Sequence, residues 1–430
     1  MKPFVKWAGG KRQILKYIRK FIDNSHEENN NDFTYIEPFL GGGAVFFDLL
    51  HKKAIINDLN SDLINAYEII KSDKYKALIE ALKELDVQYR ENPDEFYYDK
   101  RSEDREDGWP DKYDKVHRAA RMIFLNRTCY NGLYRVNSKG QFNTPIGRYS
   151  NPLICDENNI EEIHNFLKDN DVQIYNYSYE KVIDMAKEND IIYIDPPYDY
   201  EDDDGFTKYQ MDGFTFEDFK KLKTYCDKAL ERGAYVIISN NATTRVVELF
   251  DDPKYKVYYD PNRLNTKRMI NCNASERNTG KEIIFWGVPC IFPQANSLDK
   301  IVKLIMSDED ALFDKEKAKL ILDVSTDRQV SYYYSGLVYI GLVKSNKKLN
   351  DETLTAKEDI NKVKQLIIDK LLEKDLFNKL YSSFNNKEID NDLIIKEVKK
   401  VNSRLNIDTI RRRASTVKAW LEWIYTNQKI

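Results

Sequence analysis

The chain has 430 residues, 42% hydrophobic and 32% charged, so it is long enough for two or three domains that each bury a core. Its formal net charge is −4, so a nucleic-acid partner would have to be met by a local basic surface. Five scattered cysteines without CxxC spacing predict a reducing cytoplasm and argue against a disulfide framework and zinc. The charged amino terminus is unlike a secretory leader, and no apolar run approaches the roughly 20 residues of a membrane span.

Paired glycines precede the first predicted helix, which runs from Gln13 to Phe21. Glycines in this position let backbone amides approach a ligand closely, and the start of a helix favours an anion. An ordinary turn explains the same residues, and this stretch alone favours the turn.

A triple-glycine turn, Gly41–Gly43, lies between a short strand at Tyr35–Glu37 and an amphipathic helix. A second strand, Ala54–Asn57, then ends in Asp58. This is the arrangement of a nucleoside-binding βαβ unit, in which a carboxylate at the second strand's tip accepts the ribose hydroxyls. Phe46 stands where a dinucleotide pattern would have its third glycine, which favours a cofactor without a pyrophosphate over NAD.

The segment from Lys115 to Cys155 carries seven basic residues and no acidic one, whereas the helical region before it, residues 60–115, is only a charged, solvated stretch. Tyrosines and a phenylalanine are interleaved with the basic residues, as phosphate neutralisation combined with base contact requires. Asn131-Gly132 and similar turn signals predict a hairpin-like loop. A structural basic loop explains the composition equally well.

The apolar run Ile191–Ile194 stops at Asp195-Pro196-Pro197-Tyr198. Because proline cannot donate to a sheet ladder, this pattern predicts a buried strand that ends with Asp195 at its carboxyl tip. Ligands bind beyond such tips in open α/β sheets. Further strands are expected at Val172–Tyr175, Ala234–Asn240, Tyr255–Tyr259 and Lys281–Trp286, with helices at 180–187 and 214–231, so the sheet should be largely parallel with an antiparallel edge.

A domain boundary is expected between Pro289 and Ser297, after which the chain becomes lysine-rich and mostly helical. Residues 344–355 are a candidate polar wing, and the last helix has an apolar stripe with Arg411–Arg413 beside it. These arginines either touch phosphates or form a solvated basic face. The predicted helices are 299–306, 314–323, 327–343, 359–374 and 407–426.

Together these motifs resemble, in kind and order, those of the Dam-type DNA adenine methyltransferases, over roughly residues 3–288. In that family the cofactor motif precedes the DNA-reading segment, and the DPPY motif follows it. The matching stretches are KWAGGK at Lys6–Lys11, EPFLGGGAVFF at Glu37–Phe47, INDLNSDLINAY at Ile56–Tyr67, the hairpin at Phe124–Tyr149, IDPPYD at Ile194–Asp199 and INCNASERNTGKEIIFW at Ile270–Trp286.

The resemblance implies a Rossmann-like, S-adenosylmethionine-dependent catalytic domain at 1–60 and 171–290 with an inserted target-recognition domain at 61–170, followed by a C-terminal domain at 297–430. No metal is expected. Many members place an Asp-Phe pair against the cofactor adenine, and here Tyr177-Ser178-Tyr179 stands in its place. The implied cofactor-binding residues are Trp7, Ala8, Gly9, Gly10, Lys11, Glu37, Pro38, Phe39, Gly41, Gly43, Asp58, Ser178, Tyr179 and Asp195.

The implied catalytic residues are Asp195, Pro196, Pro197 and Tyr198. The 6-amino group of adenine is a poor nucleophile because its lone pair is delocalised into the ring. The Asp195 carboxylate and the Pro196 carbonyl would accept its two protons, and Tyr198 would stack on the flipped base. An ordinary strand-end cap is the other interpretation of Asp195.

The implied DNA-contacting residues lie in the hairpin and at the amino terminus. Arg135 suits a guanine edge, whereas Arg148 and Tyr149 suit phosphates. Similarity of the hairpin to GATC-modifying members predicts GATC, or a longer site containing GAT. The candidates are Lys6, Arg127, Tyr130, Asn131, Leu133, Arg135, Asn137, Pro145, Arg148 and Tyr149.

The segment after Ser297 lies outside this resemblance, but its DRQVSYYYSGLVYIGLV and TIRRRASTVKAWLEWI stretches resemble a winged-helix-like domain of some restriction–modification proteins. It is expected either to add DNA contacts or bind a cognate endonuclease, or to serve as a packing or dimerisation module. The whole chain is expected to be a bacterial cytoplasmic enzyme, monomeric or weakly dimeric. A methyltransferase of RNA or protein and a non-catalytic DNA-binding regulator remain alternatives.

Overall fold

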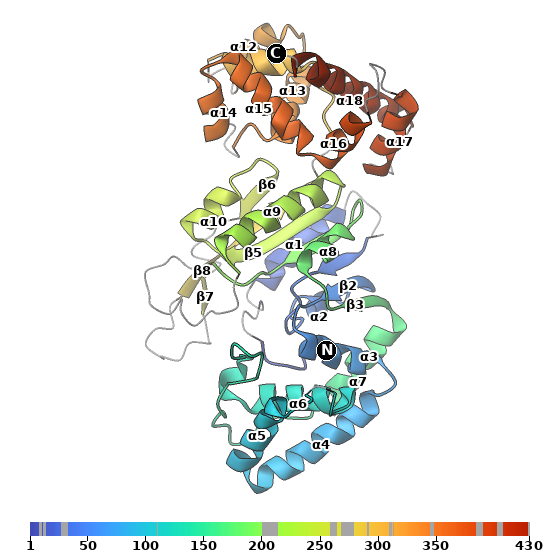
Figure 1. Cartoon of the computed structure of the whole chain (residues 1–430), viewed down its shortest axis with the longest axis vertical. Coiled ribbons are helices and arrows are strands. Elements are labelled where there is room, and N and C mark those ends of the chain that lie inside the picture. Colours follow the sequence, from blue (N-terminus) through green and yellow to red (C-terminus); the bar gives the residue numbers. More distant parts are fainter. Residues whose placement is uncertain are drawn as a thin grey trace.

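The computed structural model forms three tiers, with the sheet in the middle, one helical group on the side of α3–α6 and another formed by α11–α18 on the other side (Figure 1). It describes residues 1–7, 11, 14–26, 33–109, 111–199, 214–258, 265–267, 279–289, 292–308, 312, 314–344, 348–383, 390–401 and 407–428.

The central sheet has the strand order β3-β2-β1-β4-β5-β8-β6, and β7 pairs with β8. The pairs among β1 to β5 are parallel, whereas β8 runs antiparallel to β5, β6 and β7. The predicted parallel sheet with an antiparallel edge is therefore confirmed. The strands are β1 (Tyr35–Glu37), β2 (Lys53–Asn57), β3 (Asp171–Tyr175), β4 (Ile191–Ile194), β5 (Tyr235–Asn241), β6 (Tyr255–Tyr258), β7 (Asn265–Lys267) and β8 (Thr279–Gly287).

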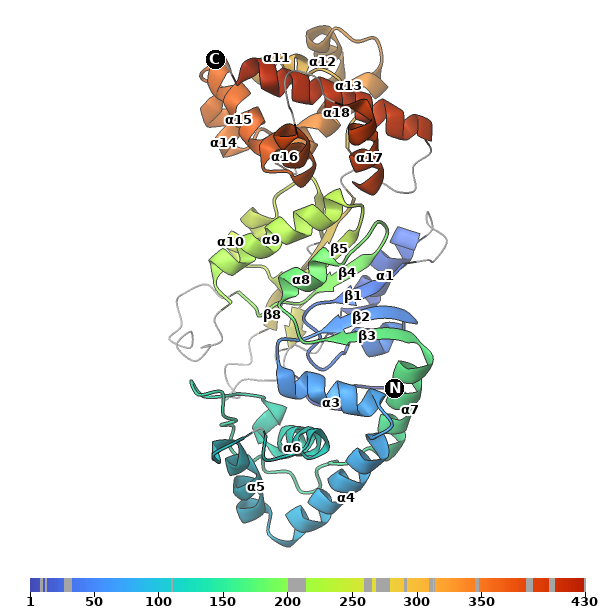
Figure 2. The same cartoon turned by 45° about the vertical axis from the view of Figure 1, so that its right-hand side comes forward.

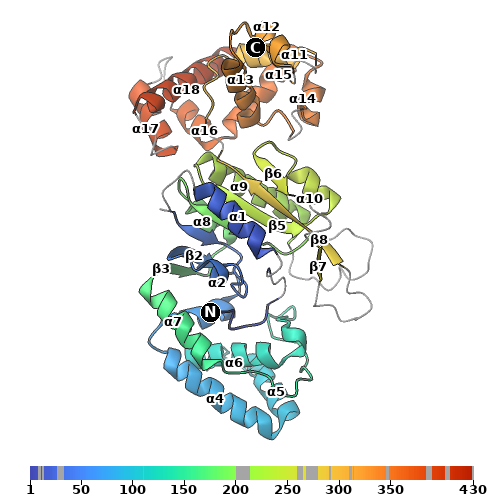
Figure 3. The same cartoon turned by 180° about the vertical axis from the view of Figure 1, so that it is seen from behind.

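Successive residues of the strands pack on opposite faces, because side chains alternate along a strand. Tyr193 and Ile237 belong to the core on the face covered by α1 (Leu15–His26), and Ile192 and Ile238 to the core beneath α8, α9 and α10. Figures 1 and 3 show these two helical layers from opposite sides. The first helix thus begins two residues later and runs further than predicted. The other helices of this tier are α2 (Phe46–Leu49), α8 (Tyr179–Asp184), α9 (Phe216–Glu231) and α10 (Thr244–Leu249).

A helical group is inserted between β2 and β3, as the charged, helical stretch predicts (Figure 2). Its core contains Phe124 and joins the core of the sheet, so the insertion is packed continuously onto the central tier. Its elements are α3 (Ser61–Lys71), α4 (Tyr75–Glu91), α5 (Pro93–Ser102), the 3-10 helix η1 (Glu103–Arg105), α6 (Lys115–Thr128), the 3-10 helix η2 (Tyr130–Gly132) and α7 (Glu157–Asp169).

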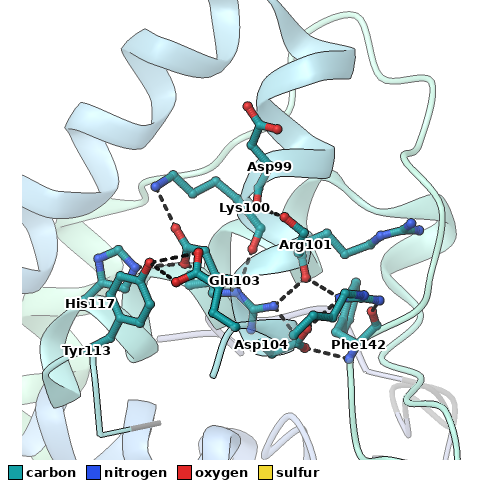
Figure 4. Close-up of polar contacts among 12 residues, drawn as sticks. Asp99, Lys100, Arg101, Glu103, Asp104, Tyr113, His117 and Phe142 are labelled. Carbon is teal, nitrogen blue, oxygen red and sulfur yellow. Dashed lines mark hydrogen bonds and ion pairs between the residues drawn. The ribbon is translucent and has the colours of Figure 1, made fainter. Parts of the chain in front are cut away.

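A buried polar network joins η1 to α6 and to the loop after it (Figure 4). Asp104 accepts the backbone N–H of Phe142 at 2.7 Å and lies 3.0 Å from the guanidinium of Arg121. Arg121 is only 4% exposed and donates to the carbonyls of Lys100 and Arg101. This basic residue therefore holds the scaffold and does not face a ligand, while Asp104 fixes the tip of the predicted hairpin.

The last tier is helical and has its own core around Trp420, whose indole N–H donates to the Ala295 carbonyl at 2.6 Å. At the predicted wing, 344–355, an antiparallel bridge joins Val343 and Leu349, but residues 351–355 belong to a helix, so the second half of that prediction is wrong. Three of the helices, α14, α16 and α17, had not been predicted. The helices are α11 (Leu298–Met306), α12 (Lys315–Leu322), α13 (Asp327–Ile340), α14 (Asp351–Ala356), α15 (Ile360–Leu372), α16 (Asp375–Ser382), α17 (Asn391–Val401) and α18 (Ile407–Asn427).

This C-terminal tier contacts the sheet at the edge where β4 and β5 begin. Lys374 forms an ion pair of 2.5 Å with Glu231 at the end of α9, and Lys228 lies 3.5 Å from Asp375. Glu231 directly precedes the turn into β5. The tier is therefore placed at the end of the strands opposite to Asp195. The predicted domain boundaries at 290 and 297 stay predictions.

The α9 helix is tied to the sheet edge by Asp227, which accepts hydrogen bonds from Lys223 at 2.7 Å and from the Tyr255 hydroxyl at 2.8 Å and pairs with Lys254 at 2.9 Å. Burial opposes ionisation of Asp227, but the two lysines outweigh it and hold the pKa of this carboxyl well below its usual range.

Replacing Asp227 by asparagine should lower the free energy of unfolding by roughly 1–3 kcal/mol at pH 7, because Lys223 and Lys254 then share only the carboxylate of Asp252. A depressed folded-state pKa stabilises the protein above about pH 4, and this stabilisation is lost as the pH falls towards the folded value. Urea unfolding at pH 7 measures the first effect, and the loss of this stabilisation is measured by repeating it at about pH 2, between the unfolded and folded pKa values. A variant as stable as the native chain at pH 7 would show that the cluster contributes nothing.

Candidate active site and DNA interface

The strand β4 ends at Asp195, as predicted, and the chain turns sharply away after it. Pro196 is buried and Pro197 is exposed, while Asp199 anchors the turn. Arg245 holds the Asp199 carboxylate with two bonds of 2.5 and 2.7 Å, and the Thr243 hydroxyl donates to it at 2.6 Å. This buried anchor keeps the Asp-Pro-Pro-Tyr segment at the carboxyl tip of the strand.

Asp195 belongs to a compact polar cluster. The Lys11 ammonium lies 2.9 Å from its Oδ1, and the Ser239 hydroxyl donates to the same atom at 3.1 Å. Lys11 also lies 2.5 Å from Oε1 of Glu282, which accepts the Tyr198 hydroxyl at 2.7 Å. Lys11 donates to Tyr198 as well, and its ammonium lies 4.3 Å from the centroid of the Tyr198 ring. Strands β4, β5 and β8 thus converge on one carboxylate.

Burial dominates the acid–base behaviour of the cluster. It raises the pKa of Asp195 to about 6, with Lys11 opposing the rise and the Glu282 charge adding to it. Burial disfavours the Lys11 ammonium, yet Asp195 and Glu282 raise its pKa above the usual value. Lys11 is therefore charged at neutral pH, while Asp195 titrates within reach of physiological conditions. The Asp195 side chain is 20% exposed, so solvent reaches one side of it.

The glycine turn follows β1 and faces the tip of β2. The Gly41 N–H donates to Asp58 at 2.8 Å, and Gly41 and Gly43 have positive φ of 51° and 72°. A Cβ on Gly41 would approach the Trp7 ring to 2.5 Å, so only glycine fits beneath this side chain. The half-exposed Asp58 carboxylate at a strand tip has the chemistry to accept ribose hydroxyls, so the residues fit a nucleoside cofactor.

Two further predicted cofactor residues lie under the same turn. Glu37 is buried and accepts the Tyr35 hydroxyl at 2.7 Å, and burial raises its pKa well above the usual value. The carbonyl of Pro38 accepts the Asn57 side chain at 2.9 Å. Both residues therefore shape the turn from below.

The aromatic wall of the candidate cofactor site is formed by Phe39 and Tyr179, whose rings stack with centroids 5.3 Å apart. The Tyr179 hydroxyl is buried and has no hydrogen-bond partner, while Ser178 is the residue that directly precedes α8. A stacked pair with an unsatisfied hydroxyl suits a planar polar ring beside it. The predicted residues Ala8, Gly9 and Gly10, and residues 270–278 of the last motif, lie outside the described residues.

The predicted hairpin is confirmed by two antiparallel bridges, Cys129–Ile146 and Val136–Phe142. Its base is tied to the amino terminus, because the Asn126 side chain bonds both the N–H and the carbonyl of Lys6, each at 2.7 Å. The Trp7 and Tyr134 rings stack at 5.6 Å, and Trp7 also lies over Gly41. The hairpin is therefore fixed beside the glycine turn that follows β1.

The predicted DNA-contacting residues divide by what their side chains do. Arg135 is half-buried and oriented by the Asn143 side chain, to which its Nε donates at 2.7 Å. The Asn137 side chain accepts the backbone N–H groups of Lys139 and Gln141 and thereby closes the hairpin turn. Arg127 donates to the Phe4 carbonyl. Asn137 and Arg127 are thus engaged in the scaffold, whereas Arg135 is held ready in an oriented position.

The remaining candidates line the outer side of the hairpin. Tyr130 and Pro145 are exposed and joined by a backbone hydrogen bond, and Asn131 adopts φ of 54°. Lys6 lies 3.9 Å from the centroid of the Tyr149 ring. Arg148 is 79% exposed and pairs with Asp94, while the Leu133 carbonyl accepts the Thr144 hydroxyl. Their contacts with DNA stay predictions.

Sequence reasoning missed Glu282, Ser239 and Asp199 as parts of the site. For Ser239 the sequence did offer a signal, because the apolar run of its strand ends in polar residues at the carboxyl tip. Glu282 lies in the matching stretch Ile270–Trp286, but that pattern does not show its place beside Asp195, which depends on the pairing of β8 with β5.

Among the described residues, no group of three or more His, Cys, Asp or Glu is placed to hold a metal ion. No helix in the described ranges combines the length and apolar character that a membrane crossing requires.

A sheet with a glycine turn after β1, an acid at the tip of β2 and an Asp-Pro-Pro-Tyr carboxylate at the tip of β4 defines a Rossmann-like methyltransferase. Residues 7–266 match the family model of the D12 class N6 adenine-specific DNA methyltransferases. The chain belongs to this family and is an adenine-specific DNA methyltransferase. Residues 300–429 match a domain family of unknown function.

Curated relatives align over the same part of the chain. A Type II methyltransferase of Lactococcus lactis subsp. cremoris is 41% identical over 286 residues, which is 66% of this chain and 94% of the relative. A Type II methyltransferase of Methanocaldococcus jannaschii is 40% identical over 291 residues, 65% of this chain and 96% of the relative. The DNA adenine methylase of Escherichia coli strain K12 is 32% identical over 287 residues, 66% of this chain and 94% of the relative.

Proposed function

We propose that this chain transfers the methyl group of S-adenosylmethionine to the 6-amino group of an adenine flipped out of duplex DNA. The observation that carries the proposal is the position of Asp195, at the tip of β4 and beside the glycine turn that follows the neighbouring strand β1. A carboxylate beside the nucleoside site can bind the amino group that receives the methyl group and can activate it there. The bound cofactor supplies an electrophilic methyl group on a sulfonium.

The chemistry follows from the acceptors at the strand tip. Ionised Asp195 and the carbonyl of Pro196 accept the two amino protons of the base, which localises the nitrogen lone pair toward the methyl group. Tyr198 stacks on the base, which must leave the helix because its amino group is inaccessible inside the duplex. Transfer is a direct displacement, and the protein contributes positioning and electrostatics.

The cofactor is assigned to the glycine turn and its surroundings. Asp58 would accept the ribose hydroxyls, and the Phe39–Tyr179 pair would bound the adenine ring of the cofactor. Trp7 would close the site above Gly41. Glu37, Pro38, Gly43 and Ser178 shape this pocket from its floor and rim.

Replacing Asp195 by asparagine should lower the rate of adenine methylation roughly 10²–10³-fold, because the amide accepts more weakly and also donates a proton. Incubation with labelled S-adenosylmethionine and duplex DNA, followed by nucleoside analysis, measures the product. The variant's affinity for duplex DNA, measured by fluorescence anisotropy, is the folding control and should be unchanged. Full turnover in the variant would refute the assigned mechanism, and label in cytosine alone would refute the proposed product.

For the recognised sequence we propose GATC or a longer site containing GAT, read by the hairpin of residues 129–146. Arg135 is the candidate for a guanine edge, because an arginine fork binds O6 and N7 together. Its bond to Asn143 fixes the plane of that fork before DNA arrives. Single-molecule sequencing of DNA from cells that express the chain reports the modified base and its flanks together.

Replacing Arg135 by alanine should cost about 1–3 kcal/mol for the cognate site and relax the choice of one base pair. Arg148 is the matched control, since it is an exposed arginine of the same segment and its loss should weaken all duplexes alike. Methylation rates on a panel of single-base variants of the site distinguish the two effects. If Arg135→Ala weakened every duplex equally, Arg135 would be a phosphate contact.

Two alternative functions are tested with the same preparation. Motifs of this kind act on other planar amines and amides, so RNA and protein substrates belong in the labelling panel. A regulator that has kept only the fold would show no binding of S-adenosylmethionine in calorimetry. The ordered glycine turn and the intact Asp-Pro-Pro-Tyr segment support the enzyme.

The role of the C-terminal tier is also a proposal. Its exposed basic surface, formed by α17 and α18, consists of Lys396, Lys399, Lys400, Arg411 and Arg412. Beside it, Arg413 is only 7% exposed, and its Nε and Nη1 have no hydrogen-bond partner. Burial lowers the pKa of Arg413 and the Glu188 carboxylate opposes this, so a carboxylate of the chain itself already acts on this guanidinium. We propose that the exposed surface binds a second stretch of DNA, because its cations can neutralise phosphates and it lies on the tier at the far end of the strands from Asp195.

Replacing Arg411 and Arg412 together by alanine should weaken binding of a long duplex and lower its salt dependence by about one per lost phosphate contact. Methylation of a short duplex should be unchanged. The matched control is Lys362→Ala on α15, an exposed cation of the same tier. Unaltered DNA binding, with dimerisation or binding of a cognate restriction endonuclease lost instead, would assign the surface to a protein partner within a restriction–modification system.

A further inference from the structure

Lys11 is the most buried cation of the site, with 3% of its side chain exposed. An ammonium group in such a place is stable only when carboxylates surround it. It has two, because Asp195 lies 2.9 Å away on one side and Glu282 lies 2.5 Å away on the other. Its position is therefore shared between the catalytic carboxylate and a carboxylate that has no assigned role.

The contacts of Lys11 coincide with those assigned to the flipped adenine. The base is to donate its amino protons to Asp195 and to stack on Tyr198. Lys11 donates to Asp195 Oδ1 and lies 4.3 Å from the centroid of the Tyr198 ring. A base and the ammonium cannot both occupy this place, so Lys11 has to leave Asp195 when the adenine enters.

Glu282 is placed to bind Lys11 after it leaves Asp195. Its carboxylate comes from β8, is buried to 3% exposure and already holds Lys11 and the Tyr198 hydroxyl. We propose that Glu282 is a positioning residue that takes Lys11 from Asp195 when the target adenine enters and keeps Tyr198 in place to stack on it. This inference rests on the proposed function and deepens it, since it names the side chain that occupies the base site before the adenine enters and the residue that takes it away.

The proposal has an electrostatic signature. The groups that face Asp195 are Lys11, Glu282, Ser239 of β5, Tyr193 of β4, and Tyr35 and Glu37 of β1. Removing the charge of Glu282 abolishes its repulsion of the Asp195 carboxylate. It also leaves Asp195 as the only carboxylate paired with Lys11 in this cluster. Both changes favour the ionised form, so the pKa of Asp195 should fall from about 6.

The test is the pH profile of kcat/KM for adenine methylation, whose acid limb reports an essential base of the free enzyme. In Glu282→Gln this limb should move to lower pH by about one pH unit. Entry of the base, followed with 2-aminopurine at the target position, should slow roughly tenfold, because Lys11 is held more tightly by Asp195. Glu282→Asp, which keeps the charge, should restore most of the native profile.

Lys11→Met gives a second, opposite test. Without the ammonium the acid limb should move to higher pH, and the base should enter faster than in the native protein. This variant keeps the proposal falsifiable if Glu282→Gln does not fold. The matched control is Asp227→Asn, because Asp227 also holds lysines and a tyrosine hydroxyl but lies on α9. It should lower thermal stability without moving the limb.

The outcomes separate the two levels of the proposal. If the native protein does not methylate adenine, the proposed function fails. If it does, but Glu282→Gln and Lys11→Met leave the acid limb and the rate of base entry unchanged, the function stands and the positioning role of Glu282 is refuted. A limb that moves equally in Asp227→Asn would also refute it, because the effect would then be one of general stability.

Discussion

The abrupt end of β4 at two prolines is the constraint on which the rest of the site depends. The carboxyl ends of parallel strands lie at the same edge of a sheet. The turn after β1, the acid after β2 and Asp195 after β4 therefore meet at one edge. Proline removes the donor that would continue the ladder, and Asp199 pins the departing chain through Arg245. The position of the Asp195 carboxylate is therefore fixed by the point at which β4 ends.

A second constraint is the cost of burying charge. Lys11, Asp195 and Glu282 are stable together because each satisfies another, whereas any of them alone would be expensive. Lys11 lies where the proposed target base would bind, on Asp195 and over the Tyr198 ring. The resting site is therefore preorganised and already occupied by this side chain. The C-terminal tier lies at the other edge of the sheet, where Lys374 meets Glu231. The DNA-binding surface proposed for this tier is therefore separate from the chemistry.

Much of this arrangement was predictable because it is local. The strand before Asp195, the glycine turn and the hairpin of the basic segment follow from short patterns whose physics is contained within a few residues. Arg121 and Asn137 show the limit of that reasoning. Both are residue types that commonly contact DNA. Arg121, however, pairs with Asp104 and donates to backbone carbonyls, and Asn137 closes the hairpin turn. The three unpredicted helices α14, α16 and α17 have 6, 8 and 11 residues, so each offers about three turns or fewer in which a helical period can be recognised.

The sequence by itself determined the class of fold, the family and the strand tip that carries Asp195, because motifs in fixed order encode local geometry. Only the tertiary structure decided what surrounds Asp195. Glu282 is 87 residues further along the chain and comes near it through the antiparallel pairing of β8 with β5. The place of the C-terminal tier was decided in the same way, by ion pairs between helices distant in sequence. Such contacts depend on strand order and packing, which no short pattern contains.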